Sequence, residues 1–324
     1  MALNALRAFN DFKPVLKGAL TWIPGVHRAL YDRYQAGGTG TARYCYGVWI
    51  KHLSLVWQAG MRSLPRTVAE LGPGKSLGTG IAAVLSGAER YCALDVVRHA
   101  SVATTAPLLE PMTELFRRRA ACPPNGFPDY SAVLNAGQFP SQILTDERLD
   151  HALAPARLAE LAKAVNRLDA DEQHPWLRYD TRCNGDLKTD GSADLLFSHV
   201  VLDLIEDLEG IYQRLALWVK PGGWMSHLID FTSHKITRAW NGHLQYSDAM
   251  WRIIMGQRPF FLNRASLSRH VALSDKYGFD VVCVQRLPRE GAIERSRLAP
   301  RFCDISDDDL NCFLGFIAAR KRER

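Results

Sequence analysis

The sequence predicts an α/β fold built on a mostly parallel sheet, and three observations support this. An apolar run at residues 67–70 leads through a glycine-rich turn into a helix at 77–86. A second apolar run at 90–96 follows and carries an acidic residue near its end. A later segment, 192–229, repeats the order of apolar run, helix and turn. Short apolar runs that alternate with helices are typical of buried parallel strands.

The glycine-rich turn holds Gly72, Gly74, Gly78 and Gly80. Glycine permits positive φ and lets a ligand lie against the backbone, and the N–H groups at a helix amino terminus are free to bind it. The acid at the tip of the second strand, Asp95, can accept hydrogen bonds from two ribose hydroxyls. This segment therefore predicts a site for a nucleotide cofactor.

The spacing of the glycines argues against a dinucleotide. A Gly-x-Gly-x-x-Gly fingerprint would place two residues between its last two glycines, whereas three separate Gly74 from Gly78. Glu70 stands two places before Gly72, where it would repel a pyrophosphate but suit a cationic amino group. An NAD-type oxidoreductase therefore stays an alternative, together with a non-catalytic scaffold protein that keeps the cofactor fold.

The sequence resembles the class I S-adenosylmethionine-dependent methyltransferases at Glu70, Gly72, Gly74, Asp95 and in the segment 192–229. The first motif of that family is acid-x-Gly-x-Gly-x-Gly, and Ser76 here replaces the third glycine. The resemblance implies a Rossmann-like methyltransferase sheet, mostly parallel with an antiparallel last strand, and S-adenosylmethionine as the cofactor. It also implies that Glu70, Gly72 and Gly74 line the methionine end of the cofactor. Asp95 would bind its ribose.

Composition describes an ordinary globular protein of 324 residues, 47% hydrophobic and 23% charged. The net charge of +6 is spread along the chain, apart from a short tail at 320–324, which we interpret as solvated. We therefore expect no nucleic-acid partner. Seven cysteines without a Cys-x-x-Cys pair favour a reducing, cytoplasmic location. No apolar run approaches about 18 residues, so we expect no stable membrane insertion.

Residues 1–66 are predicted to form an N-terminal helical cap on a methyltransferase domain at 67–324. An apolar stripe supports the cap, formed by Leu3, Leu6, Phe9, Phe12, Leu16 and Leu20. We expect this stripe to be buried rather than to lie on a membrane. A second helix at 42–57 is predicted to be a buried aromatic face or a lid over the cofactor, with Tyr44 or Tyr46 in contact with it.

About 80 residues separate the strand at 90–96 from the next at 176–180, more than one crossover helix needs. We predict a helical insertion at about 100–175, with helices at 107–119 and 155–168. Such an insertion could bound the acceptor pocket or form a surface for a homo-oligomer.

Candidate catalytic residues follow the fourth and fifth strands. His199 ends the fourth strand, beside the expected position of the transferred methyl group. Asp230 ends the strand at 224–231, and His234 follows on the loop. A histidine oriented by a carboxylate is a suitable general base, so we predict this role for His234 with Asp230.

These two residues with His243 could ligate a divalent metal, but no tight helical spacing supports this, and we predict no metal site. A purely structural polar loop is the remaining alternative.

The segment 240–264 resembles bacterial methyltransferases of sugars and surface polysaccharides. That resemblance implies aromatic residues that stack on sugar faces, namely Trp240, Tyr246, Trp251 and Phe260. It implies hydrogen bonds to hydroxyls from Asn241, His243 and Arg264. The expected activity is O-methylation of a sugar or another small hydroxylated molecule, in polysaccharide biosynthesis. The alternative is that the aromatics fill a local core. A helix at 266–277 and strands at 279–286 and 313–319 complete the predicted sheet.

Overall fold

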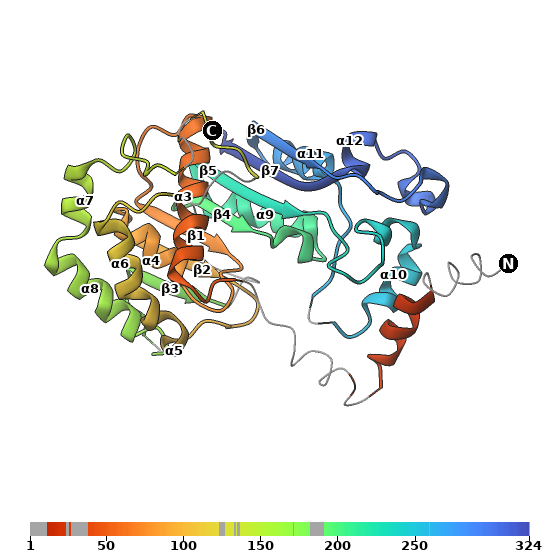
Figure 1. The fold of residues 1–324 in the computed structure, drawn as a ribbon, viewed down its shortest axis with the longest axis horizontal. Coiled ribbons are helices and arrows are strands. Elements are labelled where there is room, and N and C mark those ends of the chain that lie inside the picture. The colour runs from red at the N-terminus through yellow and green to blue at the C-terminus, as the bar shows by residue number, and fades with distance from the viewer. Residues whose placement is uncertain are drawn as a thin grey trace.

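The computed structural model describes residues 12–23, 26, 38–122, 127–132, 134, 137–170, 172–181, 191–258 and 260–323. A seven-stranded sheet runs through the centre of the protein (Figure 1). Its strands are, in spatial order, β3 (Leu177–Asp180), β2 (Arg90–Leu94), β1 (Thr67–Leu71), β4 (Ala193–His199), β5 (Val219–Asp230), β7 (Cys312–Lys321) and β6 (Phe279–Pro288). Both pairings of β7 are antiparallel and all the others are parallel. The predicted Rossmann-like methyltransferase sheet, with its last strand antiparallel, is confirmed.

Helices cover both faces of the sheet. One face carries α3 (Ala42–Ala59), α4 (Gly78–Leu85), α6 (Leu109–Arg117) and α8 (Pro155–Asn166), and the other carries α9 (Leu208–Trp218) and α11 (Leu267–Lys276). Successive side chains of a strand point to opposite faces. In β1, Val68 accordingly joins the hydrophobic cluster under α3, whereas Ala69 and Leu71 join the cluster under α9.

The remaining short elements lie in the segments that connect these strands and helices. They are α5 (Val102–Thr105), η1 (Ala106–Leu108), α7 (Asp146–Ala152), η2 (Leu202–Leu204), η3 (Gly242–Gln245), α10 (Asp248–Met255), η4 (Arg295–Arg297), η5 (Pro300–Phe302) and α12 (Asp307–Leu310). The predicted insertion, from α5 to α8, lies at one end of the sheet, and α10 lies at the other (Figure 1).

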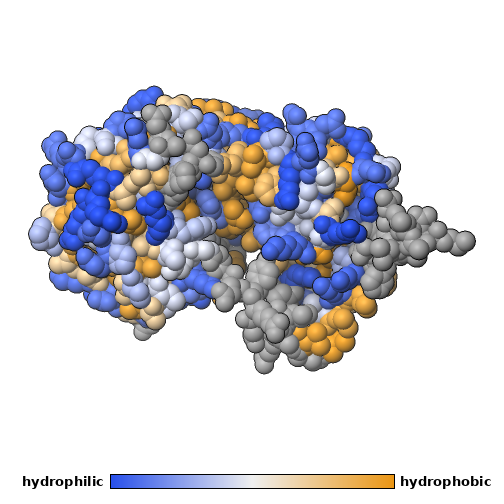
Figure 2. Space-filling model, in the orientation of Figure 1, coloured by the Kyte–Doolittle hydropathy of each residue, from blue (hydrophilic) through white to orange (hydrophobic). Residues whose placement is uncertain are grey.

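The N-terminal helix, residues 12–20, packs beside α10 rather than on the sheet (Figure 1). Phe12, Leu16 and Leu20 are 59%, 50% and 41% exposed. The prediction that the apolar stripe is buried is therefore wrong for these three residues. Its other members, Leu3, Leu6 and Phe9, lie outside the described residues. Figure 2 shows hydrophobic surface on this side of the molecule.

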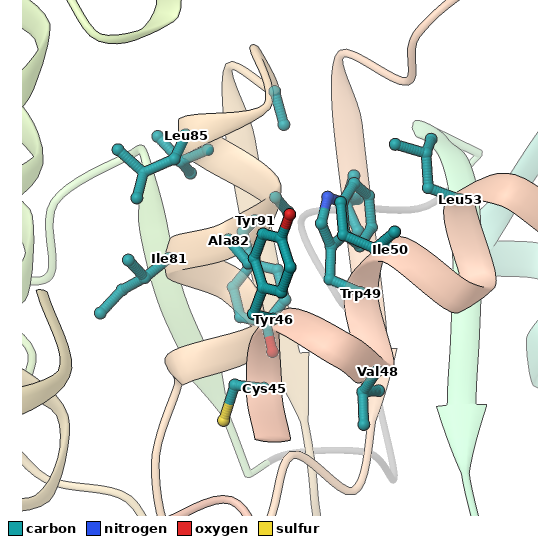
Figure 3. Packing of buried hydrophobic residues seen from close by; sticks show 14 of the residues in the cluster. Cys45, Tyr46, Val48, Trp49, Ile50, Leu53, Ile81, Ala82, Leu85 and Tyr91 are labelled. Atoms are coloured by element: carbon teal, nitrogen blue, oxygen red, sulfur yellow. The ribbon is translucent and has the colours of Figure 1, made fainter. Parts of the chain in front are cut away.

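The helix α3 is part of the main core. Thr41 caps its amino end by accepting a hydrogen bond from the backbone N–H of Tyr44, and Gly60 ends it at a φ of 123°. Its buried face, part of which Figure 3 shows, packs on α4 and α6. The Tyr46 ring lies edge-on to that of Phe116 at 5.1 Å, and the Trp49 ring lies 5.9 Å from that of Phe197 on β4. The helix therefore shares one hydrophobic core with the sheet, although the sequence groups it with the cap.

The glycine pair at Gly222 and Gly223 lies inside β5 and not in a turn before it. Val219 pairs with Ala193 and Trp224 pairs with Leu195, so the four residues between Val219 and Trp224 interrupt the ladder. Gly222 has a φ of 71°, which explains why glycine occupies this irregularity.

No helix in the described part of the chain is long and apolar enough to cross a membrane. The six cysteines within the described ranges are all free thiols. In the basic tail, Arg320 pairs with Glu323, and Arg322 pairs with Asp275 and Asp280, while Arg324 lies outside the described residues.

Candidate functional site

The carboxyl ends of β1, β2 and β4 meet at one edge of the sheet. Leu71 is level with Leu94 on β2 and with Ser198 on β4, so the residues that follow, Gly72, Asp95 and His199, stand side by side. The backbone N–H of Gly72 donates to the carbonyl of Leu94 over 2.8 Å, which fixes this alignment. Strand order reverses between β1 and β4, and open α/β sheets bind ligands at such a point.

The turn after β1 requires glycine at two positions. Gly72 and Gly74 have φ values of 69° and 75°, which side chains disfavour. A Cβ atom on Gly72 would lie 2.6 Å from a methyl of Val201, and one on Gly74 would lie 2.8 Å from Oγ1 of Thr39. The backbone at this turn is therefore closely approached from two sides.

Ser76, which replaces the third motif glycine, fastens the segment before α3 to this turn. Its hydroxyl donates to the carbonyl of Thr39, and the backbone N–H of Lys75 donates to Oγ1 of Thr39 over 2.9 Å. The Cys45 thiol also donates to the Thr39 carbonyl, over 3.5 Å. The residues before α3 thus close one side of the glycine turn.

Glu70 and Asp95 supply two carboxyl groups beside this turn. Glu70 is buried and accepts a hydrogen bond from the hydroxyl of Tyr91. Burial raises its pKa to about 8, with a further rise from Asp95 that the Tyr91 bond opposes. Asp95 accepts from the backbone N–H of Val96 over 2.8 Å and from Tyr179, and burial raises its pKa. A cationic ligand group beside Glu70 would favour its ionised form.

The two tyrosines proposed as a lid differ in position. The Tyr46 side chain is 0% exposed and its hydroxyl donates to the Ala120 carbonyl over 2.5 Å. The burial of Tyr46 is explained by its role in the hydrophobic core, so Tyr46 is not part of the candidate site. Tyr44 is 40% exposed, and its ring lies edge-on to that of His199 at 6.2 Å.

His199 belongs to a chain of three polar side chains from three elements. Its Nδ1 lies 3.2 Å from Nε2 of His52 on α3, and Nδ1 of His52 lies 2.7 Å from Oγ of Ser226 on β5. Burial lowers the pKa of His199 to about 4, and that of His52 is also lowered, first by burial and then by His199. Both imidazoles are therefore neutral at neutral pH.

His234 lies between two carboxylates, but the nearer one is not Asp230. Its Nε2 is 2.9 Å from Oδ2 of Asp203 and 3.9 Å from Oδ2 of Asp230. Burial opposes its charge, but the Asp203 hydrogen bond and both carboxylates outweigh this and raise the pKa of His234. The prediction that Asp230 orients His234 is corrected, since Asp203 makes that contact.

The loop that carries His234 is strained. His234 and Lys235 have φ values of 47° and 63°, in the left-handed region that side chains disfavour. Each such residue costs about 1 kcal/mol or more, and such strain gathers at functional sites. The imidazole on this loop contacts Asp203, which lies in η2 after β4.

Two of the four aromatic residues expected to stack on a sugar lie in a local core of the segment 240–264. Tyr246 and Trp251 are 7% and 0% exposed and share a local hydrophobic cluster. Asn241 bonds to the backbone of Leu310 and Ile293. The sequence alternative of a local core is therefore correct for these residues.

Other members of the segment also have structural partners. The buried guanidinium of Arg264 donates to the carbonyls of His243 and Tyr246 and pairs with Asp248. His243 is 5% exposed against the Trp251 ring, and burial lowers its pKa to about 3. Trp240 donates to the Glu290 carbonyl, and Phe260 lies 6.4 Å from the His234 ring. In Figure 1 the helices of the insertion lie on the opposite side of the molecule from α10, which does not support a pocket shared by the insertion and this segment.

The described residues contain no group of three or more His, Cys, Asp or Glu side chains placed to hold a metal ion. Asp230, His234 and His243 are included in this finding. The geometry therefore gives no support to the metal alternative.

Comparison with known proteins finds distant structural neighbours. No protein-family model matches the chain, and no curated protein matches it. A putative S-adenosylmethionine-dependent methyltransferase from Listeria monocytogenes is 11% identical, with a TM-score of 0.42, over 85% of this chain and 99% of that one. Phosphoethanolamine N-methyltransferase 2 from Haemonchus contortus is 16% identical, with a TM-score of 0.42. The match covers 91% of this chain and 60% of that one. A putative sarcosine dimethylglycine methyltransferase from Galdieria sulphuraria is 13% identical, with a TM-score of 0.43, over 86% of this chain and 85% of that one. The assignment of the fold rests on the strand order.

Sequence reasoning missed three polar residues that the fold brings to the site, namely His52, Asp203 and Ser226. A signal existed for His52, a lone histidine on an otherwise apolar helix face. Asp203 lies four residues beyond the end of β4, in a stretch predicted to continue into a helix.

Proposed function

We propose that the protein is an S-adenosylmethionine-dependent methyltransferase that methylates an oxygen of a small hydroxylated acceptor. The observation that carries the proposal is the glycine turn of Gly72 and Gly74 beside Asp95, at the switch point of a sheet with this strand order. Of the aromatic residues expected to stack on a sugar, Tyr246 and Trp251 are buried and Trp240 and Phe260 are half-buried, so the proposal names no sugar.

The residues present fit this cofactor by their chemistry. The carboxylate of Asp95 would accept hydrogen bonds from the ribose hydroxyls, and Gly72 and Gly74 supply the positive φ values on which the turn beside it depends. Glu70, ionised by a cationic neighbour, would offset the charge of the methionine amino group. The bound cofactor supplies an electrophilic methyl group on a sulfonium.

The acceptor hydroxyl must lose its proton as it attacks. His234 is the candidate base, because Asp203 and Asp230 both stabilise the imidazolium that forms when it takes that proton. His199 is held neutral and would position the acceptor by a hydrogen bond. Tyr44 would cover the candidate site from α3.

The test is a methyl-transfer assay with a panel of monosaccharides, phenols and hydroxy acids, in which formation of S-adenosylhomocysteine is measured. We expect turnover with at least one acceptor, strongly reduced by Asp95→Ala. Asp150→Ala, which removes an exposed carboxylate on α7, is the matched control and should be active. Reduction of NAD by one of the hydroxy acids, without methyl transfer, would overturn the proposal.

A further inference from the structure

Seven large apolar side chains form an exposed surface on the lobe made by the N-terminal helix and α10. We call this surface the lobe patch. Its members are Phe12 (59% exposed), Leu16 (50%), Leu20 (41%), Trp22 (61%), Ile23 (50%), Met250 (40%) and Ile253 (46%). Soluble proteins rarely expose so many large apolar side chains together unless the surface binds something. Hydrophobic surface on this lobe is visible at the lower right of Figure 2.

The orientation of the N-terminal helix is fixed by small residues. Gly18 faces α10 so closely that a Cβ atom there would collide with the backbone of Ile253 and Ile254. Thr21 is buried, and its hydroxyl accepts from the backbone N–H of Gln257 over 2.9 Å. Surface helices normally bury their large apolar residues. This helix buries Gly18 and exposes its large residues instead.

The exposed face also carries unbalanced positive charge. Lys13 and Lys17 each follow an apolar member of the patch, and both are exposed. The structure shows no ion pair for either lysine within the described ranges. On α10, Arg252 pairs with Glu206 over 3.0 Å. A second copy docked through the same patch would bring the lysines of both chains together, which like-charge repulsion opposes.

We propose that the lobe patch binds the surface of an anionic phospholipid bilayer. Phe12, Leu16 and Leu20 would enter the boundary between headgroups and acyl chains, and Trp22 suits that depth. Lys13 and Lys17 would contact lipid phosphates. This is peripheral binding that involves no membrane-spanning helix, and it does not depend on the proposed methyl transfer.

The contacts of the lobe connect this surface to the candidate site. Val15 of the N-terminal helix packs in the same cluster as Leu204 and Phe260. Leu204 directly follows Asp203, and the Phe260 ring lies 6.4 Å from that of His234. Bilayer binding would therefore act on the lobe that supports the candidate base.

The experiment is flotation of the full chain with vesicles of phosphatidylcholine alone or with added phosphatidylglycerol. We expect binding to the anionic vesicles and its loss at high salt. Leu16→Asp with Leu20→Asp should abolish it. Lys13→Gln with Lys17→Gln should weaken it roughly 10- to 30-fold, since each lysine near an anionic surface contributes about 1 kcal/mol.

Leu217→Asp is the matched control, because Leu217 is 57% exposed on α9, away from the patch. It should bind vesicles like the wild type. The proposal is overturned if the wild type does not float, or if the patch and control variants float equally. It is also overturned if light scattering shows a dimer that only the Leu16→Asp, Leu20→Asp variant dissociates, because the patch would then belong to a second copy.

Discussion

The histidine that ends β4 and the histidine in the loop after β5 have opposite surroundings. His199 faces another buried histidine, His52, and its pKa falls to about 4. His234 faces Asp203 and Asp230, and its pKa is raised. Both come from the same edge of the sheet. The difference shows that the neighbours of a histidine, and not its place on the strand, decide whether it can hold a proton.

The comparison predicts different catalytic losses for the two histidines. His234→Ala should lower the chemical step about 10²- to 10⁴-fold, with the affinity for S-adenosylhomocysteine nearly unchanged, because a base is lost. His199→Gln should raise KM more than it lowers kcat. Steady-state kinetics of both variants measure this. A larger loss of kcat in the His199 variant would reverse the assignment.

Acid should destabilise the protein through the histidines held neutral. His199 has a pKa of about 4, and His227, His243 and His270 have pKa values of about 3, because burial disfavours the charged form. The unfolded chain binds these protons near pH 6.5, so folding stability is lost as pH falls below that value. Each histidine costs up to about 1.4 kcal/mol per pH unit.

Denaturant unfolding at pH 7.5, 6.5 and 5.5 measures this loss. His270→Gln should reduce the dependence of the unfolding free energy on pH by the contribution of about one proton. His234 and Glu70 have the opposite sign, since a pKa that is raised in the folded state contributes stability that is lost as pH rises through that pKa. Stability that does not change between pH 7.5 and 5.5 would show that these imidazoles are not held neutral.

The two carboxylates beside His234 should contribute unequally. Asp203→Asn removes the partner at 2.9 Å and should lower kcat roughly 10-fold or more, while it shifts the pH profile to lower pH. Asp230→Asn removes the partner at 3.9 Å and should change kcat only a few-fold. Equal pH profiles for the two variants would refute the primary role of Asp203.

The smallest expected effect is that of a chelator. EDTA should leave turnover unchanged, because Asp203 and Asp230 act on His234 directly and the described residues offer no metal-binding group. Loss of activity in EDTA, restored by Mg²⁺ or Mn²⁺, would replace the base assignment with a metal site.

The sequence predicts the sheet well, because strand and turn signals are local. The turn at Gly72 is found where the pattern places it, and β2 begins at Arg90 as predicted but ends at Leu94, two residues before the predicted end at 96. Contacts between distant segments are harder to predict. Asp203 in η2 contacts His234 in the loop after β5, and His52 on α3 contacts His199 on β4, so both contacts depend on how distant segments pack.

The periodicity of the N-terminal helix gives the same lesson. It shows that Phe12, Leu16 and Leu20 share one face of the helix, but it cannot show which face of the helix packs against α10. Gly18 decides this, because only a residue without a side chain allows the backbone of α10 to approach so closely.

The most direct test of the central claim is calorimetry of cofactor binding to the purified protein. We predict that S-adenosylhomocysteine binds with one site and that NAD gives no heat. Asp95→Ala should weaken the binding by about 1.5 to 3 kcal/mol, the contribution of hydrogen bonds to a charged group, while Asp150→Ala leaves it unchanged. Tight binding of NAD, or no binding of S-adenosylhomocysteine by the folded protein, would contradict the account.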